Sequence, residues 1–165
     1  MNLPFDKHTG LALREDVVQH FPGIPEEVIR QFILDHGRKN EFQDQYGQLD
    51  LNAVVWAKET LQGNDLLGCS HFEQFDRRVQ NSRSKVSVFL KEGWKCIDRR
   101  PTVVEHWALF HTWNLPPILI EGSVVGRPSS LHLIEGHTRL GVLEGLIDAG
   151  VIDRDHCHEV WVGRQ

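Results

Sequence analysis

The segment that most narrowly limits how this chain can fold runs from Leu131 to Ile147. A short apolar run ends at Ile134 and is followed by Glu135 and Gly136. Apolar residues then recur three and four positions apart, at Leu140, Leu143, Leu146 and Ile147. This spacing predicts one buried face of a helix. We therefore expect a strand, a tight turn at Gly136 and a helix.

The start of such a helix favours a bound anion. Backbone N–H groups of the first turn have no partner within the helix, and their partial positive charge attracts phosphate. Arg139 belongs to that turn and adds a forked charge that suits phosphate oxygens. Residues 136–139 are therefore a candidate phosphate or nucleotide site. The purely structural alternative is that Arg139 forms an ion pair with Glu135 or Glu144.

The rest of the C-terminal half alternates between strands and helices. We expect strands at residues 94–97, 118–120 and 158–162, and a helix from Pro101 to about residue 114. The run at 118–120 is uniformly apolar, which is typical of a strand buried on both faces. Val124 and Val125 extend or pair with that strand. Gly141 and Gly145 would let the last helix approach the sheet closely.

The N-terminal half is predicted to be mainly helical. Helices are expected near residues 11–18, 25–37 and 50–62, and the character of the sequence changes near residues 85–93. No linker rich in Pro, Gly or Ser separates the halves. The expected fold class is α+β: a small mixed sheet with helices at residues 91–165, preceded by a helical extension at residues 1–90 that packs on it.

Composition narrows the classes of function. The chain has 165 residues and a net charge of −5, so general affinity for nucleic acid is not expected. No apolar run approaches the roughly 20 residues that cross a bilayer, and no signal peptide is recognisable. Three widely spaced cysteines, Cys69, Cys96 and Cys157, favour a reducing compartment. We expect a cytoplasmic protein without membrane association.

The order of these pieces resembles the ParB/sulfiredoxin-like superfamily. The resemblance is carried by an arginine–proline turn at residues 99–101, a proline-led strand at 116–120, and the string Glu135-Gly136-His137-Thr138-Arg139. It covers about residues 94–163, whereas residues 1–93 match no family that we recognise. Such domains have a small mixed sheet with helices and a nucleotide pocket at the start of a helix.

The resemblance implies roles for individual residues. Gly136 would allow close approach of the backbone to the ligand, Thr138 would donate its hydroxyl and Arg139 would hold phosphate. Arg99 or Arg100 lies where the family often places a further arginine that contacts phosphate. Glu135 occupies the family's acidic position and would assist a metal ion or a ribose, and His137 follows the glycine.

Departures from the family exclude two of its activities. Sulfiredoxin has a cysteine just after the glycine, and here His137 replaces the thiolate that its chemistry needs. ParB proteins continue into a DNA-binding domain, but this acidic sequence ends soon after Arg139, so DNA is not an expected partner. A third branch resembles free-serine kinases and uses a nearly identical string.

Phosphoryl transfer would need a base for the acceptor hydroxyl, and Glu121 and Glu105 are weak candidates. The resemblance implies ATP, ADP or CTP with Mg²⁺, or another phosphorylated small molecule. Whether the protein is an enzyme stays open at this point.

Three alternatives remain beside this interpretation. His156 and His158 are metal-ligand types that His132, His137 or His106 could join, but two ligands alone do not make a zinc site, and polar strand-edge residues are the simpler reading. Tryptophans of the C-terminal half are expected in the core rather than stacked on a base. The protein could also be a non-enzymatic module that binds a protein partner, such as a bacterial immunity or antitoxin protein.

Overall fold

The computed structural model describes residues 14–37 and 39–165, which form an α+β fold around a four-stranded mixed sheet. The strands lie in the order β1 (Val55–Gln62), β4 (Cys157–Arg164), β2 (Ile118–Glu121) and β3 (Leu131–Glu135). Both outer pairs are antiparallel, whereas β4 and β2 are parallel. The predicted fold class, with its small mixed sheet and mainly helical N-terminal region, is confirmed.

Helices fill most of the remaining described chain. The α- and π-helices are α1 (Arg14–His20), α2 (Glu26–Val28), the π-helical η1 (Ile29–Leu34), α3 (Asn40–Tyr46), α4 (Gly63–Leu67), α5 (Asp76–Ser84), α6 (Phe89–Glu92), α7 (Pro101–Phe110) and α8 (His137–Asp148). Single 3-10 turns are η2 (Leu51–Ala53), η3 (Glu73–Phe75), η4 (Lys85–Val88), η5 (Gly93–Cys96) and η6 (Gly122–Val125).

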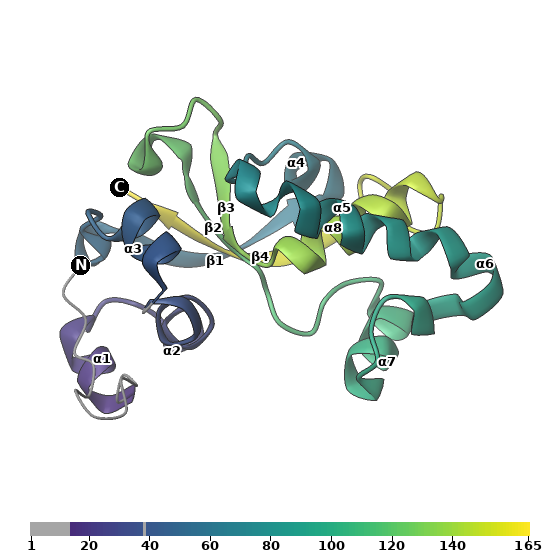
Figure 1. The fold of residues 1–165 in the computed structure, drawn as a ribbon, viewed down its shortest axis with the longest axis horizontal. Coiled ribbons are helices and arrows are strands. Elements are labelled where there is room, and N and C mark those ends of the chain that lie inside the picture. The colour runs from purple at the N-terminus through teal and green to yellow at the C-terminus, as the bar shows by residue number, and fades with distance from the viewer. Residues whose placement is uncertain (1–13, 38) are drawn as a thin grey trace.

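Both faces of the sheet are covered. Ile118 and Ile120 of β2 belong to a core shared with α1, η1 and α3. Leu119 belongs to a second core, which it shares with Leu143 and Leu146 of α8. Because successive strand residues point to opposite faces, the uniformly apolar β2 needs a helical layer on each side. In Figure 1, α1–α3 gather to the left of the strands and α5–α8 to the right.

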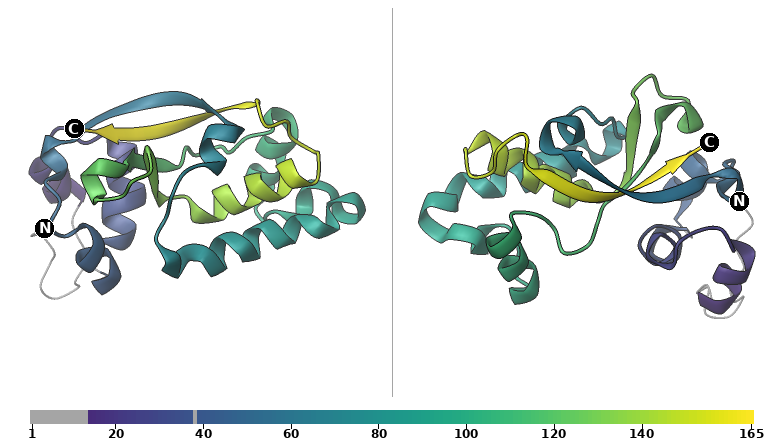
Figure 2. Two further views of the ribbon diagram at one scale, coloured as in Figure 1. Left: turned by 90° about the horizontal axis from the view of Figure 1, so that it is seen from above. Right: turned by 180° about the vertical axis from the view of Figure 1, so that it is seen from behind.

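The glycines of α8 have a different role from the one predicted. A Cβ on Gly141 would collide with the Val79 carbonyl of α5, and one on Gly145 would lie 2.6 Å from the Arg83 carbonyl oxygen. The glycine pair therefore allows α8 to approach α5 and η4, and not the sheet. Figure 2 shows α5 and α8 side by side below the strands. The two helices together form one layer.

The helix predicted at residues 50–62 is wrong over most of its length. Only η2 is helical there, and residues 55–62 form β1, which pairs with β4 from Val55 opposite Arg164 to Gln62 opposite Cys157. The segment contains good helix formers such as Ala57, Lys58 and Glu59. Pairing with a distant strand overrides that local preference.

Two short strand predictions are also wrong. Residues 94–97 lie at a 3-10 turn, η5, and Val124 and Val125 lie in η6. Both segments lie close to a glycine with positive φ, Gly93 at +59° and Gly126 at +67°. The helix from Pro101, the strands β2, β3 and β4, and α8 agree with prediction.

The N-terminal region is joined to the sheet through β1. The helical prediction at residues 25–37 is confirmed as α2 and η1. Of the helix predicted near residues 11–18, Val17 and Val18 lie in α1, whereas Leu11 and Leu13 lie outside the described residues. The division into residues 1–90 and 91–165 stays a prediction. No helix within 14–37 and 39–165 has the length and apolar character to cross a membrane.

Candidate functional site

The segment Glu135–Arg139 joins β3 to α8 as a tight turn. β3 ends at Glu135, Gly136 has a φ of +109°, and α8 begins at His137. A Cβ on Gly136 would lie 2.5 Å from Cβ of Pro117. Glycine is thus required both by its positive φ and by the neighbouring proline. The first turn of α8 presents backbone N–H groups that a helix cannot satisfy internally.

Arg139 is held by the protein itself. Its Nη1 atom donates to the Leu115 carbonyl at 2.6 Å and to Oε1 of Gln31 at 2.9 Å, while Nη2 donates to Oε1 of Glu135 at 3.2 Å. The side chain is only 18% exposed. The predicted ion pair with Glu135 is present, whereas Glu144 lies 4.0 Å from Arg83. Arg139 therefore fastens the start of α8 to two other segments.

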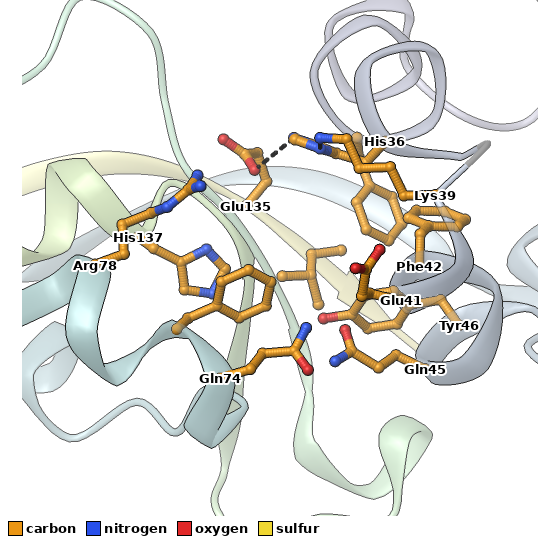
Figure 3. Close-up of a pocket in the computed structure, with 13 residues that line it drawn as sticks. His36, Lys39, Glu41, Phe42, Gln45, Tyr46, Gln74, Arg78, Glu135 and His137 are labelled. Atoms are coloured by element: carbon orange, nitrogen blue, oxygen red, sulfur yellow. Dashed lines mark hydrogen bonds and ion pairs between the residues drawn. The ribbon is translucent and has the colours of Figure 1, made fainter.

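Glu135 is shared between Arg139 and the N-terminal helices. Its Oε2 atom lies 3.1 Å from Nε2 of His36 (Figure 3). Burial alone would raise the pKa of Glu135, but the hydrogen bond with His36 and the charge of Arg139 outweigh it and lower this pKa below its ordinary value. Glu135 is thus a carboxylate at neutral pH.

One pocket opens beside Thr138. We name it the arginine pocket; it has a volume of about 340 Å³ and is lined by residues that include Arg100, Trp107, Trp113, Asn114, Thr138 and Arg139. Arg100 is 74% exposed and donates to both carboxylate oxygens of Asp98, at 2.9 and 2.7 Å. The bonds from Arg100 lower the pKa of Asp98 to about 2. Arg99 is exposed and does not line this pocket.

A second pocket opens on the other side of the segment, beside His137. We name it the tyrosine pocket; it has a volume of about 370 Å³ and is lined by residues that include Phe42, Gln45, Tyr46, Gln74, Phe75 and His137. Figure 3 shows that the walls come from the N-terminal helices, from η3 and α5, and from the end of β3. Glu135 lines both pockets.

Polar groups deep in the tyrosine pocket lack partners. Tyr46 Oη and His137 Nε2 are buried and make no hydrogen bond with any described residue of the chain. His137 stacks on Phe75 with ring centroids 3.9 Å apart. Burial lowers the pKa of His137 to about 3 and raises the pKa of Tyr46, so both side chains are neutral at physiological pH.

The two weak candidates for a catalytic base lie away from this segment. Ile118 at the start of β2 pairs with Glu135, but Glu121 at its other end pairs with Leu131. Glu105 is exposed on α7. Neither carboxylate lines the arginine pocket or the tyrosine pocket. The structure does not bring them together with Glu135–Arg139.

The histidines considered as metal ligands are used in other ways. His158 Nδ1 lies 2.9 Å from the Thr112 hydroxyl, and His132 Nδ1 lies 2.8 Å from the Ser70 hydroxyl. His106 packs on Phe110. Within residues 14–37 and 39–165, no three side chains of the His, Cys, Asp or Glu type are arranged to hold a metal ion.

Comparison with protein families, curated proteins and solved structures finds no match to this chain. The site is therefore interpreted from its own geometry. The sequence pattern predicts an anion site at residues 136–139, whereas Arg99 or Arg100 and Glu135 were expected as ligands only from the family resemblance. Sequence reasoning missed Phe42, Tyr46 and Phe75, whose segments carry no motif and meet only in the folded chain.

Proposed function

We propose that this protein binds a phosphorylated small molecule, in the first instance a nucleotide, in the arginine pocket at the start of α8. The observation that carries the proposal is that Thr138 and Arg139 line one pocket together with Arg100, from which they are separated by more than a whole helix and strand. The helix start at residues 136–139 and the segment of Arg100, which are far apart in the sequence, thus meet at one cavity.

Arg100 is the group best suited to take up the phosphate. The Arg100 side chain is 74% exposed and that of its partner Asp98 is 20% exposed, and an ion pair at the surface contributes only about 0–1 kcal/mol to stability. Exchange of that carboxylate for a more highly charged phosphate costs little. The exposed Thr138 hydroxyl and the first amides of α8 supply further donors.

Arg139 acts differently from the role that the sequence predicts for it. Its bonds to Leu115, Gln31 and Glu135 hold the wall of the pocket and the helix start in place. It contributes a fixed positive charge near the ligand and does not itself donate hydrogen bonds to the phosphate. Asp35 and Asp98 also line the pocket, so a nucleotide would bring Mg²⁺ to carboxylates that favour it.

The resemblance to the ParB/sulfiredoxin-like superfamily stays a prediction, and this proposal does not depend on it. Phosphoryl transfer is a separate prediction, for which neither Glu121 nor Glu105 gives support. A protein-binding role of the immunity or antitoxin kind also stays a prediction. The geometry supports a binding site for phosphate more directly than it supports any one of these.

Tryptophan fluorescence tests the proposal, because Trp107 and Trp113 line the arginine pocket. Pyrophosphate, ADP, ATP and CTP are titrated with and without Mg²⁺, and affinities are measured by calorimetry. At least one ligand should give a saturable change, and Arg100→Ala should weaken its binding about 10- to 100-fold through loss of charged hydrogen bonds.

Arg99→Ala is the matched control, since Arg99 is also exposed but does not line the pocket. Its affinity for the same ligand should equal that of the unsubstituted protein. Absence of saturable binding for every phosphate ligand would overturn the proposal. So would an equal loss of affinity in the two variants, because binding would then depend only on general charge.

A further inference from the structure

We propose that the tyrosine pocket is a second binding site, which takes a small, neutral, planar nitrogen heterocycle of the nucleobase or nucleoside kind. This proposal does not rest on the phosphate site. One wall consists of residues from the ranges 32–36 and 39–46, which lie outside the segment that resembles a known family. Its volume of about 370 Å³ lies within the range of small-molecule sites.

Aromatic rings give the pocket its preference for a planar ligand. Phe42 and Tyr46 are tilted toward each other on the α3 side, with ring centroids 5.4 Å apart. Phe75 and His137 form a stacked pair on the opposite side. A flat ligand between these walls would make offset or edge-to-face contacts with rings on both sides.

Unsatisfied hydrogen-bonding groups give the pocket its preference for a polar ligand. Of the five buried side-chain atoms that lack partners among the described residues, two line this pocket, Tyr46 Oη and His137 Nε2. Tyr46 is 2% exposed and His137 is 3% exposed. A buried donor or acceptor without a partner destabilises the folded chain by roughly 1–3 kcal/mol, which a ligand with matching atoms would relieve.

The polar rim indicates a ligand with both donors and acceptors and no net charge. Gln45 and Gln74 reach into the pocket from opposite walls (Figure 3), and each amide offers two donors and one acceptor oxygen. Cations and carboxylates around the pocket are balanced: Lys39 and Arg78 against Glu41 and Glu135. His137 is neutral and adds no charge. A heterocycle with an edge of mixed polarity fits this arrangement.

A single probe reports on this site, because Tyr46 is the only tyrosine in the sequence. The full chain is labelled with fluorotyrosine and followed by fluorine NMR. Adenosine, guanosine, cytidine and uridine are titrated separately, with ribose and pyrophosphate as controls. At least one nucleoside should shift the resonance saturably, while ribose should leave it unchanged.

Two variants localise the binding by calorimetry. Tyr46→Phe keeps the ring and removes only the hydroxyl, and should weaken nucleoside binding about 3- to 10-fold. Gln74→Ala changes an exposed rim residue, so the fold is retained while affinity falls by a similar factor. Arg100→Ala, in the other pocket, should leave nucleoside affinity unchanged.

The two proposals fail separately. No saturable shift with any nucleoside at millimolar concentrations overturns the heterocycle site, whatever pyrophosphate does in the arginine pocket. Unchanged affinity in both Tyr46→Phe and Gln74→Ala overturns it as well. Loss of nucleoside affinity in Arg100→Ala would place the heterocycle in the arginine pocket and would also overturn this proposal.

Discussion

The two pockets that flank Glu135–Arg139 differ in how their polar groups are satisfied. In the arginine pocket, Arg139 and Arg100 both have protein partners, one in the interior and one at the surface. In the tyrosine pocket, Tyr46 Oη and His137 Nε2 have none among the described residues. The segment Glu135–Arg139 therefore separates a pocket whose arginines have hydrogen-bond partners from a pocket with two unsatisfied buried polar atoms.

This difference shows that a residue of a recognisable motif, here Arg139, can serve the stability of the fold and not the binding of a ligand. Arg139 is the most conspicuous residue of the string, yet its donors are used by Gln31, Leu115 and Glu135. Tyr46 belongs to no recognisable motif, yet its hydroxyl makes no hydrogen bond with any described residue. Four substitutions test this difference between the two pockets.

The largest loss of stability is expected for Arg139→Ala. The change removes a donor from the partly buried Glu135 carboxylate, from Gln31 Oε1 and from two backbone carbonyls, and breaking such a largely buried ion pair typically destabilises a protein by about 3–5 kcal/mol. Urea unfolding followed by circular dichroism measures it. Arg83→Ala, which removes an exposed arginine paired with Asp148, should cost no more than about 1 kcal/mol. Equal losses would contradict a fastening role for Arg139.

Gly136→Ala should follow, with a loss of about 3 kcal/mol. It combines a positive φ with a Cβ placed 2.5 Å from that of Pro117. Gly126 is the control, because its φ is also positive but nothing lies within 4 Å of its Cβ position. Gly126→Ala should cost only about 1 kcal/mol. A similar loss in both would mean that the proline contact is unimportant.

The pH dependence of stability should report the neutral His137. Its pKa of about 3 in the folded chain lies below its ordinary value, so only the unfolded chain takes up a proton as the pH falls below about 6.5. Stability is therefore full above that pH and falls toward pH 3, by up to about 1.4 kcal/mol per pH unit for this histidine.

Unfolding of His137→Phe at several pH values tests this, because phenylalanine keeps the stack on Phe75 without titrating. Its free energy of unfolding should depend less steeply on pH between about 4 and 6.5. His132 and His158, whose burial lowers the pKa of each to about 4, supply the remaining slope in this range. The contribution of Glu135, whose pKa is lowered, is lost as the pH falls from the ordinary glutamate value through the lowered one, so it adds to the slope at the acidic end of this range. An unchanged slope would contradict a neutral, buried His137.

The smallest effect on stability is expected for Tyr46→Phe. Since the hydroxyl has no partner among the described residues, its removal should change the free energy of unfolding by less than about 0.5 kcal/mol or should stabilise the chain. Ser70→Ala provides the contrast, because that hydroxyl lies 2.8 Å from His132 Nδ1, and should cost about 1 kcal/mol. A clear loss in Tyr46→Phe would reveal a partner.

The sequence pattern predicted those strands and helices whose conformation depends on burial and on the periodicity of nearby residues. The apolar run at 118–120 and the helical spacing from Leu140 to Ile147 gave β2 and α8, because burial on two faces and helix periodicity leave direct marks on the sequence. β1 was missed because its strand conformation depends on pairing with β4, about 100 residues away. Ala57, Lys58 and Glu59 favour a helix in isolation.

The residues of the candidate site likewise fall into a predicted group and an unpredicted group. Residues 136–139 were predicted because a glycine and an arginine at a helix start are visible as a string, whereas Arg99 or Arg100 followed only from the family resemblance. The partners of Arg139 were less visible: Gln31 and the Leu115 carbonyl come from segments with no sign of a polar role. The tyrosine pocket was not predicted, because its aromatic walls look like ordinary core residues until three segments meet.

The position of β4 sets the order in which this molecule can assemble. β1 and β2 are joined only through β4, and β4 is made from residues 157–164. During synthesis, residues 55–62 leave the ribosome well before the strand that they need, and their backbone groups remain unpaired in the interval. Sheet formation is therefore a late, long-range event, and folding should be slow for a chain of this helical content. Mutations that weaken β4 would leave the backbone N–H and C=O groups of β1 unpaired and able to pair with strands of other chains.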